Sequence, residues 1–197
     1  MKFIDISRPL LKAPKYPTAP DTVLDQVDRI AEGKDSNFTH ITTNTHAGTH
    51  ADAFCHFVDG GTAIGDMPLE LYYGPCRVLS FPERTILTRE DFQGKLTGAE
   101  RVAIHGGGFT YLRADAAQYL ADCGIRCLVT DGWSPAPLDN EKEIHRILLL
   151  NHVAVIENVI LDHVKDGDYD LIAFPANFGD TDGAPVRAVL VEQEETI

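Results

Sequence analysis

The stretch NTHAGTHADAFCHF, residues 44–57, gathers three histidines and one aspartate within eleven positions. These four residues are His46, His50, Asp52 and His56. All stand at even positions, so an extended chain would direct their side chains to one face. In a straight strand the first two histidines would still lie roughly 13 Å apart, whereas two ligands that are each about 2.1 Å from one ion must nearly touch. The sequence therefore predicts a bend between them, either at Gly48 or in a single helical turn.

These residue types indicate a transition-metal site. Imidazole together with a carboxylate suits zinc, manganese or iron better than calcium or magnesium. One histidine in a strand is usually an ordinary hydrogen-bonded residue, but four such residues this close together favour metal binding. Cys55 stands at an odd position of the same stretch, and we expect its thiol to point into the core instead of binding the ion.

The composition bounds the class of protein. The chain has 197 residues, which suits one domain of ordinary size over residues 1–197. Thirty acidic and 17 basic residues give a formal net charge of −13. This charge repels phosphates and anionic headgroups, so nucleic acid and membrane surfaces are not expected partners. The N-terminus MKFIDISRPL lacks the apolar run of a signal peptide, and no stretch approaches the roughly 18 apolar residues of a membrane span. We expect a cytoplasmic protein.

Six short runs rich in valine, isoleucine and leucine predict buried strands, because each is ended by Gly, Pro, Asn, Asp or Glu. The runs are CRVLSF (76–81), RVAIHG (101–106), IRCLVTDG (125–132), HVAVIENV (152–159), YDLIAF (169–174) and VRAVLV (186–191). The segments 111–124 and 139–150 predict helices. Gly124 would end the first helix, and Asn140 with Glu143 would form a capping box on the second. The fold class is therefore α/β with a mixed sheet.

The first 45 residues are less regular. KFIDIS (2–7) alternates apolar and polar residues as an edge or half-buried strand does. RPLLKAPKYPTAPD (8–21) must be a loop, because its prolines remove donors and fix φ, and this loop could form the rim of a site. Residues 22–45 fit a strand or a helix, and the β-branched run FTHITTNT (38–45) favours strands.

Two further residues could complete a metal site. His145 lies on the second predicted helix, and Glu157 ends the apolar run HVAVIE. A carboxylate at the end of a buried strand is costly to bury unless something positive meets it. The alternative is that Glu157 emerges into solvent.

At this point the sequence resembles a known family. HAGTHADAFCHF is similar to the HxGTHxDxxxH signature of the bacterial metal-dependent cyclase and kynurenine formamidase family. The resemblance extends over most of the chain, through DISRPL, PKYP, TDGWSPAPLDNEKEIHRILL, HVAVIENV, YDLIAFP and DGAPVRAVLV. It implies a swivelling β/β/α fold, with a mixed, partly barrel-like central sheet and peripheral helices, in a homodimer or a higher homo-oligomer.

The resemblance also implies a site with two divalent metal ions, zinc before manganese. His46, His50 and Asp52 would bind the first ion. Asp52 would bridge to a second ion, held by His145 and Glu157, and Glu157 could be shared between the two. His56 would stay free as the proton shuttle, because an unligated imidazole near neutral pKa can accept and return a proton. Tyr16, on the rim, could stack on a substrate ring.

The implied activity is that of a metal-dependent hydrolase acting on a small molecule. An arylformamidase, converting N-formylkynurenine to kynurenine and formate, is the first expectation, and hydrolysis of isatin or of lactones is the alternative. The chain departs from the family pattern at Phe54, where proline is usual, and in the segments RVAIHGGGF (101–109) and TDGWSP (130–135). These departures concern the substrate and leave the metal-binding residues untouched.

Two other functions compete with this one. HGGG (105–108) and GWSPA (132–136) resemble the oxyanion loop and nucleophile elbow of a serine hydrolase. However, Pro135 would follow the nucleophile Ser134 and has no N–H to donate to an oxyanion, so a flexible turn is the favoured interpretation of HGGG. A non-catalytic metal-binding protein would have a closed coordination sphere and no use for a spare base such as His56.

The remaining reactive residues are assigned ordinary roles. Four scattered cysteines indicate free thiols in a reducing compartment, and the CxxxC pair Cys123 and Cys127 lacks the second pair of a structural zinc site. Arg187 is expected to pair with a buried carboxylate. The other histidines are expected to make ordinary hydrogen bonds, with His105 as a pocket candidate by position only; these are His40, His105, His152 and His163.

Overall fold

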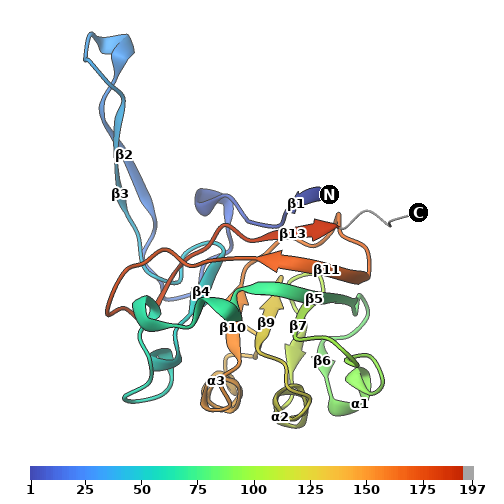
Figure 1. The fold of residues 1–197 in the computed structure, drawn as a ribbon. Helices are drawn as coiled ribbons and strands as arrows, with labels where there is room; N and C mark the ends of the chain where they lie inside the picture. Colours follow the sequence, from blue (N-terminus) through green and yellow to red (C-terminus); the bar gives the residue numbers. More distant parts are fainter. Residues whose placement is uncertain (193–197) are drawn as a thin grey trace.

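A nine-stranded mixed sheet curls through the body of the protein in the computed structural model, which describes residues 1–192 (Figure 1). The strand order is β1-β13-β11-β5-β7-β9-β10-β4-β12. The strands are β1 Lys2–Asp5, β4 His50–Asp52, β5 Tyr73–Ser80, β7 Arg101–His105, β9 Cys127–Thr130, β10 Ala154–Glu157, β11 Gly167–Ile172, β12 Gly183–Pro185 and β13 Val189–Glu192. β5, β7, β9 and β10 run parallel to their neighbours in that series, and the other pairings are antiparallel. The expected fold class is confirmed.

All six apolar runs form strands of this sheet, as predicted. β9 and β10 are buried at every position, as expected for parallel strands covered on both faces. β5 and β11 are only partly buried. KFIDIS forms β1 at one end of the strand order, which confirms the predicted edge strand.

Helices cover one side of the parallel strands (Figure 1). They are α1 Arg89–Phe92, α2 Ala114–Asp122 and α3 Glu141–Leu150. The other short elements are the 3-10 helices Leu10–Lys12, Ile30–Glu32, Phe54–His56, Ile64–Asp66 and Leu69–Leu71 and the small two-stranded sheet of β6 Ile86–Leu87 and β8 Tyr111–Leu112. α2 and α3 confirm the two predicted helices. Within the described chain, no helix has the length and apolar character that crossing a membrane would require.

The predicted capping box of α3 is wrong. Asn140 does occupy the N-cap position, but its side chain makes no capping hydrogen bond within the described chain. Its backbone N–H donates to Pro137 O at 3.0 Å and closes a turn. That N–H is therefore not available to Glu143, and the backbone of Asn140, with ψ of 12°, departs from the extended conformation that a capping side chain needs.

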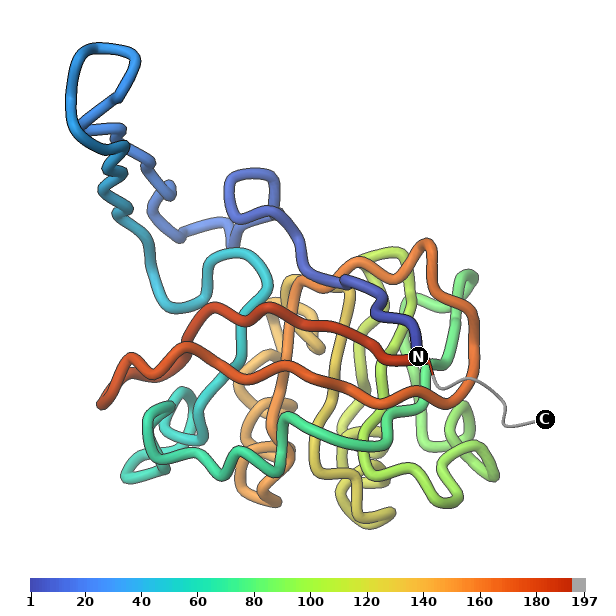
Figure 2. Tube along the Cα trace, turned by 45° about the horizontal axis from the view of Figure 1, so that its top comes forward, coloured from blue at the N-terminus to red at the C-terminus, as the bar shows by residue number. Residues whose placement is uncertain are grey.

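Residues 22–45 form a hairpin that projects from the body (Figures 1 and 2). Its strands are β2 Val23–Asp28 and β3 Phe38–Thr42, paired antiparallel with an irregularity between Gln26 and Asp28. The prediction of strands is confirmed here. The β-branched residues favour the extended backbone, although most side chains of the hairpin are exposed.

Surface and thiol predictions have mixed outcomes. Arg187 does pair with a carboxylate, Asp5, at 3.0 Å from Nε to Oδ1, but Asp5 is 45% exposed. The prediction of a buried partner is therefore wrong, because Asp5 belongs to an edge strand that faces solvent.

All four cysteines are free, with Cys123 exposed and Cys127 buried, which is not an arrangement for one shared ion. Cys55 packs against the core with a partly buried thiol.

Asp91 at the start of α1 supplies a test of local stability. Its carboxylate completes a capping box with Thr88 and accepts a hydrogen bond from Arg84. Burial raises the pKa of Asp91, but the hydrogen bonds from Thr88 and Arg84 outweigh burial and leave the pKa lowered. We expect Asp91→Asn to reduce the free energy of unfolding by about 1 kcal/mol at pH 7, measured by urea denaturation.

The pH dependence follows from the sign of that shift. Because the folded pKa lies below the unfolded value of about 3.9, the contribution is fully present above that value and is lost as the pH falls through the folded pKa. The difference between wild type and Asp91→Asn should therefore shrink in acid, while Glu90→Gln, an exposed neighbour, should change little. A difference that is the same at pH 7 and at low pH would contradict this account.

Candidate metal centre

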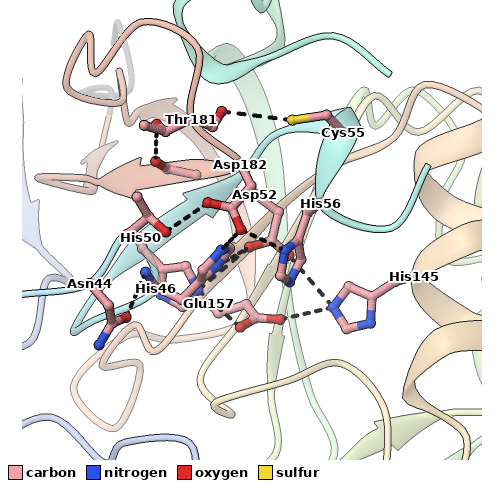
Figure 3. A network of polar contacts seen from close by, with 12 residues as sticks. Asn44, His46, His50, Asp52, Cys55, His56, His145, Glu157, Thr181 and Asp182 are labelled. Carbon is pink, nitrogen blue, oxygen red and sulfur yellow. Dashed lines mark hydrogen bonds and ion pairs between the residues drawn. The ribbon is translucent and has the colours of Figure 1, made fainter. Parts of the chain in front are cut away.

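Strand pairing brings distant residues of the candidate centre together (Figure 3). In the antiparallel pair of β4 and β10, His50 stands opposite Glu157 and Asp52 opposite Val155. α3 packs on β10 and adds His145. Glu157 is only 5% exposed, so the alternative in which it emerges into solvent is wrong. All of the residues predicted to bind metal lie in one place.

Gly48 bends the chain that carries the first histidines. Its φ is +68°, a conformation that glycine adopts without strain, and no helical turn spans this segment. The backbone N–H of His46 donates to Asn44 Oδ1 at 2.9 Å, which fixes the turn before the bend. The predicted bend at Gly48 is confirmed, and the predicted alternative of a helical turn is wrong.

Each carboxylate of the cluster divides its two oxygens between different histidines. Asp52 Oδ1 lies 3.0 Å from His46 Nδ1 and 3.5 Å from His50 Nε2, and Asp52 Oδ2 lies 3.5 Å from His145 Nε2. Glu157 does the same, with Oε2 3.2 Å from His50 Nε2 and Oε1 3.2 Å from His145 Nε2. Two ligands of one tetrahedral zinc ion lie about 3.4 Å apart. These spacings therefore fit one ion near His46 and His50 and another near His145.

Polar atoms without partners support this fit. His50 Nε2 and Asp52 Oδ2 are buried and make no well-formed hydrogen bond within residues 1–192, although Glu157 Oε2 and His145 Nε2 lie 3.2 and 3.5 Å from them; a bound cation would satisfy both atoms. His50 Nδ1 donates to Gly48 O and His145 Nδ1 donates to Glu141 O, both at 2.9 Å. Because Nδ1 carries the hydrogen in each case, Nε2 is the nitrogen that would offer its lone pair to a bound metal.

The electrostatic field of the cluster favours positive charge. Burial alone would lower the pKa of His46, but the hydrogen bonds and charges of Asp52 and Asp182 raise it to about 9. Burial also opposes protonation of His145, yet Asp52 and Glu157 raise its pKa to about 10. Asp52 has a pKa well below its usual range, because the imidazoles of His145 and His46, which face its two oxygens, outweigh its burial. A site that attracts protons this strongly also attracts a divalent cation.

His56 differs from the other imidazoles. Burial, together with the charges of His46 and His145, lowers its pKa despite the attraction of Asp52. Its ring stacks on that of His46 with the centroids 4.0 Å apart. Ligand atoms of His46, Asp52 and His56 also lie within 4.8 Å of one another. Distances alone therefore permit His56 to be a ligand or a free base, and mutation separates the two roles.

A cavity of about 420 Å³ opens onto the cluster. Histidines 46, 50, 56 and 145 line its floor with Glu157, and Tyr16, Phe57 and Trp133 are among its walls. The ring of Tyr16 meets Trp133 edge-on at a centroid distance of 5.3 Å, and its hydroxyl donates to Glu141 Oε2 at 3.0 Å. Tyr16 thus lies in the wall, as its predicted role in substrate binding requires.

Sequence reasoning missed several residues of this site, among them Asp182, Trp133 and Asn158. Asp182, in the loop before β12, contacts both His46 and His56. Trp133 lines the cavity, whereas in the sequence its segment drew attention as a departure from the family pattern and as a possible nucleophile elbow. Asn158 follows Glu157 with a φ of +59° and a buried Oδ1 that has no hydrogen-bond partner in the described chain. In the sequence, Asn158 could have been noticed because it and Glu157 are two adjacent polar residues at the end of an apolar strand.

The serine hydrolase alternative fails on geometry. The backbone N–H groups of Gly106 and Gly107 donate to Asp131 Oδ2 at 3.0 and 2.9 Å, so they are not available to an oxyanion. Ser134 is completely buried, and its Oγ accepts a hydrogen bond from the N–H of Ala136. A buried hydroxyl in that position cannot attack a substrate.

The other four histidines do not line this cavity. The suggestion that His105 belongs to the pocket is therefore wrong. His105 Nε2 is 3.4 Å from Asp162 Oδ1. His163 Nε2 donates to Asp5 O at 3.1 Å, and His152 packs edge-on against Phe54. His40 lies on the exposed strand β3.

The comparisons with known proteins agree with this geometry. The family model named Cyclase matches residues 4–137. The chain belongs to this cyclase family. A kynurenine formamidase of Bacillus anthracis is 35% identical over 202 residues, covering 96% of this chain and 97% of the relative. Another, of Bacillus cereus, is 37% identical over 166 residues, covering 78% of this chain and 79% of the relative.

Solved structures support the family fold. A potential metal-dependent hydrolase with cyclase activity superposes with a TM-score of 0.85 at 26% identity, covering 98% of both chains. An isatin hydrolase bound to the product analogue thioisatinate gives a TM-score of 0.84 at 16% identity, covering 98% of this chain and 93% of that chain. This second likeness concerns the fold alone.

Gly183 provides a test of the centre. A Cβ at this position would lie 2.9 Å from His46 Cε1 and 2.9 Å from Ala51 O, so an alanine must shift the imidazole or the β4 backbone beside it. We expect Gly183→Ala to weaken zinc binding by about 10- to 100-fold, measured by competition with a chromophoric chelator. Gly65→Ala is the control, because its Cβ would crowd Gly179 and Asn177 and no residue of the metal cluster. Equal zinc affinity in Gly183→Ala and wild type would contradict the ligand role of His46.

Proposed function

We propose that the protein is a metal-dependent hydrolase of carbon–nitrogen bonds other than peptide bonds, of the arylformamidase type, that converts N-formylkynurenine to kynurenine and formate. The observation that carries this proposal is the cluster of three histidines and two carboxylates, all but His46 buried, at a cavity that His56 also lines. The kynurenine formamidases that align over nearly the whole chain support the same reaction.

The assignment of ligands follows the division of carboxylate oxygens. His46, His50 and Asp52 would hold one ion, and His145 and Glu157 would hold a second ion that Asp52 bridges. Zinc suits this donor set first and manganese second. When bound, such ions supply an activated water near neutral pH and polarise the carbonyl of the substrate.

His56 would act as the general base and acid. It lines the cavity, its pKa is lowered, and it therefore stays neutral at neutral pH. A neutral imidazole can take a proton from the attacking water and return it to the leaving amine. Asp182 holds the Nδ1 side of this ring at 3.2 Å, so Nε2 is the nitrogen that would exchange the proton.

The cavity suits a planar aromatic substrate. Tyr16 and Trp133 meet edge-on and Phe57 stacks on His145 with a centroid distance of 4.4 Å, so three aromatic side chains surround the space above the cluster. Aromatic rings pack favourably against such walls in offset or edge-to-face geometry. Tyr16, held by Glu141, would contact the substrate ring.

Further features of the proposal concern assembly and location. We propose a homodimer or higher homo-oligomer in the cytoplasm. The hairpin of β2 and β3 exposes large apolar side chains, among them Val27, Phe38 and Ile41, and a two-stranded hairpin alone is marginally stable in water. Light scattering of the purified protein tests the assembly.

Hydrolysis of N-formylkynurenine is the decisive experiment. The protein is stripped with a chelator, then reloaded with zinc or with manganese, and release of kynurenine is followed. We expect the stripped protein to lose at least about 100-fold in rate, one of the metals to restore it, and serine-directed reagents to have no effect.

The negative outcomes are informative. A folded protein that binds both metals but leaves N-formylkynurenine intact would exclude the formamidase and direct the search to isatin and lactones. A protein that holds metal tightly and hydrolyses no amide, ester or lactone would be a non-catalytic metal-binding protein, and the hydrolase proposal would be wrong.

A further inference from the structure

One carboxylate outside the candidate ligand set contacts two of the histidines. Asp182 Oδ2 lies 3.0 Å from His46 Nε2 and 3.2 Å from His56 Nδ1 (Figure 3). A carboxylate at neutral pH accepts hydrogen bonds and cannot donate them. The two ring nitrogens that face Asp182 must therefore both carry a hydrogen.

We propose that Asp182 is a positioning residue that selects the tautomer of His46 and of His56 at the same time. Nδ1 of His46 lies 3.0 Å from Asp52 Oδ1; with Nε2 kept protonated by Asp182, Nδ1 is the nitrogen that would give up its hydrogen and present its lone pair to a bound ion. With its hydrogen on Nδ1, His56 keeps the lone pair of Nε2 for proton transfer. This inference rests on the proposed hydrolase function.

The need for such a residue follows from the other ligands. The outer nitrogens of His50 and His145 are fixed by backbone carbonyls, Gly48 O and Glu141 O. For His46 Nε2 and His56 Nδ1, the hydrogen-bond partner within residues 1–192 is Asp182. Outer-shell carboxylates on a ligating histidine fix its tautomer and increase its basicity. Asp182 would extend this effect to the proton shuttle.

The loop holds the carboxylate in a defined place. Thr45 Oγ1 donates to Asp182 Oδ1 at 2.8 Å, which leaves Oδ2 for the two imidazoles. The N–H of Ala53 donates to Asp182 O, and the N–H of Ile64 donates to Thr181 O, both at 2.9 Å. Because backbone bonds hold the loop and the Asp182 side chain is 46% exposed, removing the carboxylate should leave the fold intact.

The test compares Asp182→Ala and Asp182→Asn with wild type. We expect Asp182→Ala to bind zinc about 10- to 100-fold more weakly, in competition with a chromophoric chelator, and kcat for N-formylkynurenine to fall by about 100-fold with KM nearly unchanged. Asp182→Asn keeps one acceptor oxygen and should lie between the two. In long-range ¹H–¹⁵N spectra, wild type should show His56 with hydrogen on Nδ1, and Asp182→Ala should populate both tautomers.

Asp180→Asn is the matched control, since Asp180 is exposed in the same loop two residues earlier, and it should behave as wild type. Unchanged zinc affinity and an unchanged His56 tautomer in Asp182→Ala would overturn the inference. So would a lower thermal stability of the metal-free variant with no other change, because that result defines a structural role.

The two proposals fail in different ways. If wild type hydrolyses N-formylkynurenine and Asp182→Ala matches it in every readout, the positioning role is wrong and the hydrolase stands. If wild type leaves this substrate intact but Asp182→Ala loses zinc affinity and the His56 tautomer, the positioning role stands and the formamidase is wrong.

Discussion

Asp52→Ala should lose both bound metal and hydrolytic activity. Asp52 is 1% exposed, and its two oxygens face His46, His50 and His145. Without this anion, the candidate ions lose their shared ligand and one of the three carboxylates, Asp52, Glu157 and Asp182, that face the histidines. We expect bound zinc to fall below one ion per chain after gel filtration and the rate to drop by at least about 1,000-fold, since a catalytic ion contributes several kcal/mol to the transition state.

Metal analysis by mass spectrometry and steady-state kinetics measure the two effects. Asp59→Ala is the matched control, because Asp59 is an exposed carboxylate of the same segment, and it should retain both metal and rate. Asp52→Asn keeps the size and one oxygen and should recover part of the metal. If Asp52→Ala kept its full complement of metal, the assignment of the bridging ligand would be wrong.

His56→Ala should retain the metal and lose most of its turnover. The imidazole lies next to His46, yet its lowered pKa and its contact with Asp182 suit a base better than a ligand. Removing a general acid–base residue typically costs about 100- to 10,000-fold in rate. We therefore expect that loss in kcat, with bound zinc unchanged and KM altered little.

The comparison with Asp52→Ala decides the role of His56. His40→Ala, on the exposed strand β3, controls for the removal of a histidine and should leave the rate unchanged. Equal loss of metal in His56→Ala and Asp52→Ala would make His56 a ligand and remove it from the proton shuttle.

Most strands of the fold could be predicted from the local pattern of apolar residues in the sequence. The six apolar runs became strands because parallel and central strands need continuous apolar residues to cover both faces. The same reasoning failed at Asn140, where a turn closed by Pro137 took the backbone N–H that a capping box requires. Residue preferences at a helix start do not show which competing hydrogen bond wins.

Some residues of the candidate site could also be predicted from the sequence, and others could not. His46, His50 and Asp52 could be found from sequence, since they lie within one short segment and Gly48 permits the necessary bend. Asp182 could not, because an aspartate between threonine and glycine looks like any turn residue. Its contact with His46 spans 136 positions of the chain.

The sequence by itself determined the first candidate donors, His46, His50 and Asp52, and the bend that gathers them, because these depend on bond geometry over a few residues. Only the tertiary structure decided that Glu157 stands opposite His50, that α3 delivers His145, and that the loop before β12 places Asp182 between two imidazoles. Strand register and packing set these contacts, and both are properties of the whole sheet that a local run of residues does not encode.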